Sequence, residues 1–597
     1  MERRQLRRGA SDGVHALCVG RRIASDGNPA GGRVILREGG TLVANPSGST
    51  ASVAGLLLGH MGGANNNLVA SYIQEGGLAT VGRVMASYEK NATGSLTIYG
   101  GVFDMPYIDS NTRFRIGQKG YGMFQLLGGD VYALTNYTAN LSTPGKRFEP
   151  RISFDIGTGQ SEGNGFRGAY FYGNAGSFTC GSDFAVSCAT GNDTGVAPSH
   201  ATFDGTLCVT SRTVRIGANT SDGRASLNLN GGTLNSDFIF ANKDRRGISE
   251  INADGGKIVF GSTAVQQQFL FLNAINIYEG GLEIDVSRPE GVYVGNAGTN
   301  VVLRTPGGYG VAIDSVTSIG SSPCQPWIEI SGGSGSNATA VAFADFNSNT
   351  MTNAVIACRG EGYAAGDTVT ASAIRHWTGS PGTRTDRVVL KLVENRPGAL
   401  VKTGAYKLNL FAQPEFAGTY EVRSGWMVQT TTAGVASPKV RAVVVGGTDD
   451  AMFQAGSGNA TATEANWNPV NPAATVTLGT ANGPGRLTVP GGADGKPFEQ
   501  TFASLTVNGT GNVIAEAGGQ LVNASGAKLA FGTIACAEGS QLTIPKWNSR
   551  FKVYVTGMPA GTRLKNVVFA GTNGKYAAVG KDGQLVKAVV GTVMLVK

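Results

Sequence analysis

The sequence predicts an all-β fold: a right-handed parallel β-solenoid (β-helix) with a small inserted β module and a C-terminal cap. Three observations predict it. Glycine accounts for 90 of the 597 residues, about twice the usual share. Hydrophobic residues make up 41% and charged residues only 15% of the chain, so the chain can bury a core that a disordered glycine-rich segment lacks. A Gly-Gly pair followed by a short β segment also recurs along the chain, as in a repeat architecture.

The Gly-Gly repeat sets the length of one coil. Neighbouring pairs are 24, 28, 24 and 25 residues apart (76 to 100, 100 to 128, 231 to 255, and 255 to 280). About 24 residues suits one coil of a three-sided solenoid, whose coils stack about 4.8 Å apart. An antiparallel sandwich is the alternative, and the regular Gly-Gly spacing favours the solenoid. The pairs are Gly39-Gly40, Gly76-Gly77, Gly100-Gly101, Gly128-Gly129, Gly231-Gly232, Gly255-Gly256 and Gly280-Gly281.

The segments between the glycine pairs have the pattern of half-buried strands. Residues 225–230 (ASLNLN) alternate apolar and polar, so one face of the strand points into a core. Glycine supplies the positive φ or the close backbone approach that a corner needs. An apolar residue followed by glycine marks a further corner in several coils, as in Ile116-Gly117 and Ile216-Gly217.

Composition divides the chain into five regions. We expect an irregular basic N-terminal extension, a solenoid with an irregular aromatic stretch near 140–210, a Gly-rich β module, a second solenoid stretch and a C-terminal β cap. Loop insertions in the 140–210 stretch would be the expected place for a binding surface. The boundaries are 1–33, 34–310, 311–395, 396–545 and 546–597, in that order.

Charge and hydropathy exclude two classes of partner. The net charge is +8, but Arg3, Arg4, Arg7 and Arg8 supply much of it, and no Lys/Arg stripe interleaved with aromatic residues follows. We therefore predict no nucleic-acid binding. No apolar run reaches about 18 residues, so we predict no membrane-spanning helix. The basic start is not followed by the apolar stretch of an export signal, so no such signal is visible in this chain.

The seven cysteines leave two interpretations open. Cys180 and Cys188, or Cys324 and Cys358, could form a disulfide in an oxidising compartment, or all could be small buried residues of the solenoid. No CxxC pair occurs, so we expect no zinc site. The remaining cysteines are Cys18, Cys208 and Cys536.

Few residues qualify for chemistry. The four histidines (His15, His60, His200 and His376) are scattered, so neither a metal cluster nor a Ser-His-Asp set can be assembled from them. The adjacent acids Asp449-Asp450 fit a polar turn better than a catalytic pair, which needs both carboxylates on one face. Arg375, His376 and Trp377 could line a sugar site but fit an ordinary loop better. We therefore predict no enzyme activity, no catalytic, cofactor-binding or metal residue, and no cofactor.

The Gly-rich module resembles a module of phage and bacterial surface β-proteins. Two segments show the resemblance: ISGGSGSNATAVAFADF and GEGYAAGDTV. In the second segment we expect Tyr363 and Asp367 to hold a turn. The resemblance suggests a β fold and implies little about function.

Residues 398–428 read GALVKTGAYKLNLFAQPEFAGTYEVRSGWMV. This segment resembles the autotransporter-associated β-strand repeat (passenger-associated transport repeat). The departure from the repeat is Trp426-Met427-Val428, where a small residue and Leu are usual. The matching positions are Leu400, Lys402, Gly404, Leu408, Leu410, Phe416, Gly418, Tyr420, Val422, Gly425 and Met427.

This resemblance implies an autotransporter passenger. We expect a non-catalytic repeat protein that is extracellular or on the bacterial outer surface, with a structural or adhesive role. Its partners would be host, matrix or glycan surfaces, and its oligomeric state is open. The alternatives are a carbohydrate-active β-helix enzyme of the pectin-lyase-like kind, or a structural protein like a phage tail fibre.

Overall fold

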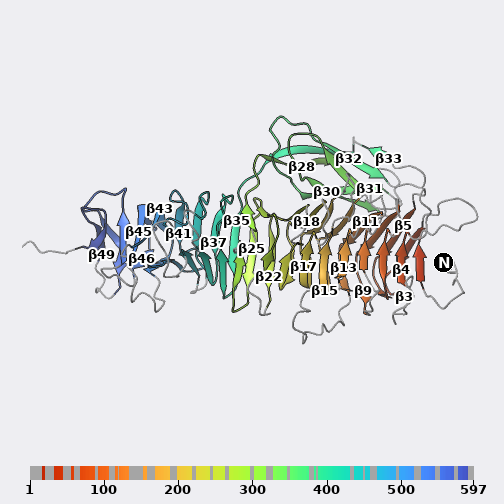
Figure 1. Ribbon diagram of the computed structural model, residues 1–597, viewed down its shortest axis with the longest axis horizontal. Coiled ribbons are helices and arrows are strands. Elements are labelled where there is room, and N and C mark those ends of the chain that lie inside the picture. The colour runs from red at the N-terminus through yellow and green to blue at the C-terminus, as the bar shows by residue number, and fades with distance from the viewer. Residues whose placement is uncertain are drawn as a thin grey trace, which may run out of the picture. The chain divides into compact units, whose positions relative to one another are not determined.

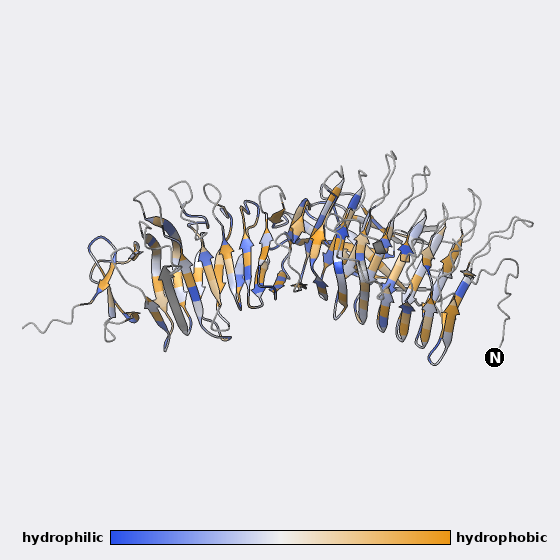
Figure 2. Ribbon diagram, turned by 60° about the horizontal axis from the view of Figure 1, so that its bottom comes forward, coloured by the Kyte–Doolittle hydropathy of each residue, from blue (hydrophilic) through white to orange (hydrophobic). Residues whose placement is uncertain are grey.

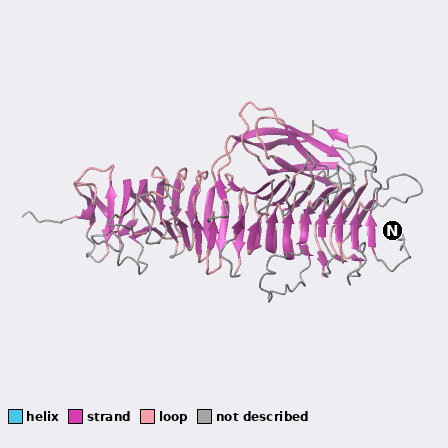
Figure 3. Ribbon diagram, in the orientation of Figure 1, coloured by secondary structure: helices cyan, strands magenta, loops and turns pink. Residues whose placement is uncertain are grey.

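Every secondary-structure element in the described part of the chain is a β-strand (Figure 3). The computed structural model describes residues 16–19, 32–44, 55–59, 68–87, 92–106, 114–117, 120–133, 152–157, 168–187, 198–217, 223–242, 247–261, 268–295, 301–317, 327–345, 350–375, 382–384, 387–430, 436–447, 451–456, 467–491, 497–515, 526–544, 551–570 and 576–588. These residues form two compact units. The first unit comprises Met1–Ile258, Leu270–Tyr278 and Pro306–Arg396, and the second comprises Val259–Phe269, Glu279–Thr305 and Pro397–Lys597.

The first unit contains a parallel β-solenoid with three strands in each coil (Figure 1). Strands stack in sequence order, each pairing in parallel with its counterpart in the next coil. The first side contains β1 (Ala16–Val19), β4 (Gly55–Leu58), β7 (Val84–Ala86), β10 (Phe114–Ile116), β13 (Ile152–Ile156), the later halves of β15 (Ser177–Val186) and β17 (Cys208–Ile216), and β20 (Phe238–Phe240).

The other two sides follow the same rule. The second side contains β2 (Gly32–Leu36), β5 (Val69–Gln74), β8 (Thr93–Ile98), β11 (Tyr121–Leu126), β14 (Ala169–Gly173), β16 (Ser199–Phe203), β18 (Arg224–Leu229), β21 (Ile248–Ala253) and β24 (Ala274–Ile277). The third side contains β3 (Thr41–Ala44), β6 (Leu78–Val81), β9 (Val102–Met105), β12 (Asp130–Ala133), the earlier halves of β15 and β17, and β19 (Thr233–Ser236). Two further strands, β22 (Gly256–Phe260) and β23 (Phe269–Leu270), each include residues of both units.

Glycine forms the corners, as the repeat predicts. Gly77, Gly101 and Gly129 have φ of 77°, 79° and 75°, a region that residues with a side chain rarely adopt. These corners also stack closely: the Val102 amide donates to the Gly77 carbonyl at 2.9 Å, and a Cβ on Gly101 would lie 2.3 Å from that carbonyl oxygen. The glycine repeat thus reflects both backbone conformation and contact between coils.

The aromatic stretch near 140–210 continues the stack in its described parts. The side chains of Phe154, Phe171, Phe178 and Phe184 are fully buried in the solenoid, with neighbouring ring centroids 4.8–5.9 Å apart. These phenylalanines therefore form part of the core, and the loop insertions expected in this stretch lie outside the described residues. The pairing of β15 shifts its register between Cys180 and Asp183, which is the local irregularity.

The inserted module has a core of its own. Strands β28 (Tyr309–Val316) and β34 (Val388–Glu394) form an antiparallel pair, and β31 (Thr350–Cys358), β30 (Thr339–Asp345), β29 (Trp327–Ser331), β32 (Thr370–Arg375) and β33 (Gly382–Arg384) form an antiparallel sheet in that order. Ile328, Ala342, Ala373 and Val388 are among the buried residues between them. The turn expected around Asp367 is present: one carboxylate oxygen accepts hydrogen bonds from the Ser334 amide, the Ser334 hydroxyl and the Ala364 amide at 2.6–2.8 Å.

The second unit is also a stack of parallel strands. One sheet contains β25 (Leu282–Val286), β35 (Ala399–Thr403), β37 (Thr419–Val422), β39 (Ala442–Val445), β41 (Thr475–Leu478), β43 (Phe498–Val507), β45 (Ala527–Cys536) and β47 (Phe551–Val555). The other contains β26 (Val292–Val294), β36 (Lys407–Leu410), β38 (Trp426–Gln429), β40 (Met452–Ala455), β42 (Gly485–Val489), β44 (Thr510–Ala515), β46 (Gln541–Ile544) and β48 (Arg563–Phe569), followed by the antiparallel β49 (Tyr576–Val579) and β50 (Leu585–Lys587). Strand β27 (Val302–Arg304) precedes the module in the chain.

Polar and apolar residues share single strands throughout both units (Figure 2). In β6, for example, Ala79 and Val81 are fully buried while Leu78 is exposed and Thr80 is half-buried. This period of two leaves a set of outward side chains on each side of the solenoid. Those outward sets are where a functional surface must be sought.

Candidate functional site

Most residues that the sequence offered for chemistry fall outside the described ranges. These are His15, His60, His376, Trp377, Asp449 and Asp450, together with Cys188 and Cys324 from the two possible disulfides. The described Cys358 has a free thiol. Among the described residues, no three His, Cys, Asp or Glu side chains lie close enough together to hold a metal ion.

His200 is the one candidate histidine in a described range. It lies on β16 with its ring stacked on Tyr170, at 5.7 Å between centroids and 6° between planes. Burial lowers the pKa of His200 from 6.5 to about 4, so the imidazole is neutral at pH 7. Neither Tyr170 on β14 nor Ser226 on β18, its register neighbours, offers a carboxylate that would orient a general base.

The first side of the solenoid carries a row of alternating charge. Arg115 on β10 pairs in register with Asp155 on β13, and Arg215 lies two strands further along the same outward row. The Nε of Arg215 lies 2.9 Å from an Asp183 carboxylate oxygen, and its guanidinium lies 5.1 Å from the Phe240 ring centroid. Burial lowers the pKa of Arg215, and the carboxylates of Asp183 and Asp155 oppose this shift. The arrangement neutralises charge across stacked coils.

Sequence reasoning missed this charge row because coil length varies there. Arg115 and Asp155 are 40 residues apart, whereas Asp155 and its next partner, Ala185, are 30 apart. A search at a period of 24 therefore does not align them.

On the second side, the side chains that point away from the solenoid core are themselves buried. We call this surface the covered face. Two rows of outward side chains run across β5 to β24 in register, and all are at most 6% exposed. Most of these side chains are polar, which is unusual for buried positions. One row is Ser71, Ser95, Met123, Tyr170, His200, Ser226, Glu250 and Ala274, and the other is Ile73, Thr97, Gln125, Tyr172, Thr202, Asn228, Asn252 and Asn276.

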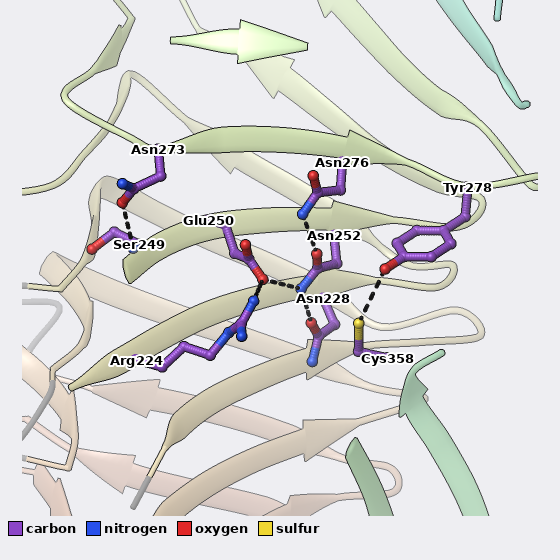
Figure 4. Close-up of polar contacts among 9 residues, drawn as sticks. All are labelled: Arg224, Asn228, Ser249, Glu250, Asn252, Asn273, Asn276, Tyr278 and Cys358. Atoms are coloured by element: carbon purple, nitrogen blue, oxygen red, sulfur yellow. Dashed lines mark hydrogen bonds and ion pairs between the residues drawn. The ribbon is translucent and has the colours of Figure 1, made fainter. Parts of the chain in front are cut away.

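An asparagine ladder runs through the second of these rows (Figure 4). The side-chain amide of Asn276 donates to the carbonyl oxygen of Asn252 at 2.8 Å, and that of Asn252 donates to Asn228 at 2.9 Å. Each step is 24 residues long, so this spacing is the signal by which the sequence could have revealed the ladder. Arg224 and Glu250 form an ion pair beside it.

The third side carries outward residues that are exposed or half-buried, which we call the open face. Its outward residues are accessible on every strand from β3 to β19, and its inward residues are buried on every strand from β6 to β19. Tyr132, Leu78 and Val43 are 36%, 42% and 60% exposed. One row is Thr41, Leu78, Val102, Asp130, Ser177, Cys208 and Thr233, and the other is Val43, Thr80, Asp104, Tyr132, Thr179, Thr210 and Asn235.

The open face is chemically suited to a neutral, hydroxyl-rich partner. It carries Ser and Thr hydroxyls, the Asn235 amide, the Tyr132 ring, and two carboxylates, Asp104 and Asp130, but no Lys or Arg in either row. Asp130 accepts a 2.6 Å hydrogen bond from the Ser177 hydroxyl, and burial raises the pKa of Asp104. Because the strands are parallel and in register, like positions repeat about every 4.8 Å.

The residues that resemble the transport repeat have structural roles. Leu400, Lys402, Tyr420 and Met427 are buried, and Gly425 has a φ of 63°. The ammonium group of Lys402 donates hydrogen bonds to the carbonyls of Thr403, Gly404 and Ser424 at 2.5, 2.7 and 3.1 Å. These bonds provide a donor to backbone carbonyls at a corner of the coil. Among the other matching positions, Leu408 and Leu410 on β36, Val422 on β37 and Phe416 between these two strands are buried as well.

Comparison with known proteins assigns no family. No protein-family model matches the chain, and neither a curated protein nor a solved structure is similar to it. The resemblance of residues 398–428 therefore stays a prediction. Within the described ranges, the structure contains no helix of the length and hydropathy needed to cross a bilayer.

Proposed function

We propose that the chain is a non-catalytic repeat protein with a structural or adhesive role, and that its open face binds neutral, extended glycans. The observation that carries the proposal is the contrast between the accessible third side and the buried outward residues of the second side. Hydroxyl groups repeated on successive strands can hydrogen-bond to a sugar chain, and the Tyr132 ring can stack against it. The absence of cationic side chains in the two rows disfavours a polyanionic ligand.

The finer features of the fold belong to the same proposal. We infer that the coils are right-handed, because crossover connections between parallel strands almost always have that hand. We also infer that β48, β49 and β50 cap the second unit, since their antiparallel pairing ends the parallel stack. Export to the cell surface or beyond rests on the resemblance of residues 398–428.

A binding experiment tests the glycan proposal. The purified chain is incubated with a panel of insoluble neutral polysaccharides, including β-glucan, cellulose and chitin, and the bound fraction is measured. We expect binding to at least one of them, and Tyr132→Ala to weaken that binding about tenfold, the loss of one ring contact of about 1.5 kcal/mol.

The matched control is Tyr576→Ala, which removes an exposed tyrosine of the second unit and should bind as the native chain does. Equal affinity of the native chain and Tyr132→Ala would contradict the proposal, as would failure to bind any glycan of the panel. Exposure on the cell is tested separately, by whether protease added to intact source cells digests the protein.

A glycan-processing enzyme is the second candidate, favoured by two carboxylates, Asp155 and Asp183, that both interact electrostatically with Arg215. Incubation with pectin and other soluble polysaccharides, with detection of new reducing or unsaturated ends, tests it. Turnover by the native chain that is lost in Asp183→Asn would refute the non-catalytic proposal and support the enzyme. A trimeric mass in solution would instead favour a fibre-like protein.

A further inference from the structure

The inserted module packs against the covered face of the solenoid. Val341 and Ala357 of the module form an apolar cluster with Met123, Tyr170 and Tyr172, and the Phe343 ring lies edge-on to Tyr172 at 5.1 Å between centroids. Figure 1 shows the module sheet, with β30 and β31, beside β11 and β18. Contacts between residues more than a hundred positions apart in sequence therefore hold the module in place.

Polar contacts make up much of this interface. The Gln125 amide donates to the Ala342 carbonyl at 2.9 Å, and the Asn230 amide donates to the Ala357 carbonyl at 2.9 Å. An ion pair joins Arg359 to Asp254 at 2.9 Å, with both side chains partly exposed. Each such bond contributes on the order of 1 kcal/mol net, because water replaces it when the surfaces separate.

The module does not need the solenoid for its own core. Along β30, Ala340 and Ala342 face the core between the two module sheets, whereas Val341 and Phe343 face the solenoid. The apolar core between the two module sheets consists of alanine, isoleucine, valine and leucine side chains that belong to the module itself. The module can thus leave the covered face without losing its internal packing.

Both connections of the module lie side by side. The Asn395 amide donates to the Gly308 carbonyl at 2.9 Å, and the Asn395 side chain donates to the Gly360 carbonyl at 3.0 Å. Pro306-Gly307-Gly308 precedes the first strand, and Pro397-Gly398 follows the last. A module tied at one point can rotate about that point, and Gly308, with a φ of 66°, lies there.

The covered face also carries polar groups without a partner. The hydroxyls of Ser95 and Thr97 and the Asn276 side-chain oxygen are buried and make no hydrogen bond. A buried unsatisfied group costs about 1–3 kcal/mol relative to a hydrated one. Unsatisfied groups of this kind destabilise a permanent interface, and water can satisfy them when the surface is exposed.

From these observations we propose that the module is a reversibly docked cover: it leaves the covered face as a folded unit and exposes the two polar rows. The native Cys358 reports on this motion. Its thiol is 4% exposed and lies 3.6 Å from the Tyr278 hydroxyl, and burial raises its pKa to about 11. In the docked state Cys358 therefore reacts slowly with alkylating agents, and undocking makes it accessible.

The test is native-state thiol labelling of the full chain, with each cysteine followed by peptide mass spectrometry. A variant with Val209→Cys, a fully buried solenoid position, reports global opening, and one with Ala373→Cys, in the module core, reports module unfolding. We expect Cys358 to react at least a hundredfold faster than either engineered cysteine.

Two outcomes overturn the proposal. Labelling of Cys358 no faster than Val209→Cys means that the module leaves only when the solenoid unfolds. Labelling of Cys358 together with Ala373→Cys means that the module unfolds rather than undocks.

Variants on the module provide the second arm. Phe343→Ala removes the ring contact with Tyr172, and we expect it to accelerate Cys358 labelling at least tenfold with no effect on the Val209→Cys reporter. The control is Val389→Ala, which truncates a side chain of β34 that is 47% exposed and should change neither rate. Equal effects of the two alanine variants would contradict reversible docking.

Discussion

The glycine corners of the third side allow a sharp test of the stacked-coil architecture. Gly39 and Gly101 both have positive φ, 72° and 79°. A Cβ on Gly39 would meet nothing within 4 Å, whereas one on Gly101 would lie 2.3 Å from the Gly77 carbonyl oxygen in the preceding coil. Alanine at either site has the same conformational strain, but only Gly101→Ala forces two coils apart.

The expected magnitudes follow from these contacts. The left-handed conformation costs alanine about 1–2 kcal/mol, which is the whole effect expected for Gly39→Ala. Gly101→Ala adds an overpacking term of about 1–3 kcal/mol. The amide bond from Val102 to Gly77 lies at the same corner, so Gly101→Ala should also weaken the pairing of β6 with β9.

Hydrogen exchange followed by mass spectrometry measures these effects on the substituted corner and its strands. We expect the opening free energy to fall by about 3 kcal/mol in Gly101→Ala and by about 1 kcal/mol in Gly39→Ala, a difference of more than tenfold in exchange rate. Equal losses in the two variants would refute the close stacking of corners on which the solenoid rests.

Three further predictions concern buried polar groups. Asn252→Leu removes the hydrogen bonds to both neighbours in the asparagine ladder, Asn228 and Asn276. It should lower the free energy of unfolding, measured by urea denaturation, by about 3 kcal/mol, which is about twice the loss in Asn276→Leu. The pKa of His200 is about 4 in the folded chain, below its ordinary 6.5. Because the unfolded chain therefore binds the extra proton, stability falls as pH drops from 6.5 to 4, by at most about 1.4 kcal/mol per pH unit. His200→Phe should remove that slope, and an unchanged slope argues against a buried neutral imidazole. Lys402→Met removes the ammonium group that donates to three corner carbonyls and should cost about 3 kcal/mol, whereas Lys552→Met, at an exposed position, should cost little. Similar losses in thermal unfolding would contradict the capping role.

The predictable part of the fold is the part with a local signal. Gly-Gly pairs and alternating strands indicate coils of about 24 residues because each corner and each strand is encoded by adjacent residues. The asparagine ladder falls into this class as well, since Asn228, Asn252 and Asn276 share that spacing.

The unpredicted part depends on contacts between distant residues. Nothing in residues 311–395 alone indicates that Val341 and Phe343 pack against Tyr172 rather than face solvent. The inward packing of the aromatic stretch also depends on distant residues: Phe154 and Phe184 belong to strands of successive coils, and only their register shows that both face inward. The accessibility of the open face in the described part of the chain likewise depends on where distant elements pack, which no local pattern indicates.

Hydroxyl-radical footprinting with a bound glycan tests the central claim most directly. In the free chain, Leu78 and Tyr132 of the open face and Tyr406 and Tyr576 of the second unit are all exposed enough to be oxidised. With a neutral polysaccharide bound, we predict that oxidation of Leu78 and Tyr132 falls severalfold while that of Tyr406 and Tyr576 stays unchanged. Protection of Tyr406 and Tyr576, with Leu78 and Tyr132 still oxidised at the free rate, would contradict the assignment of the open face as the binding surface.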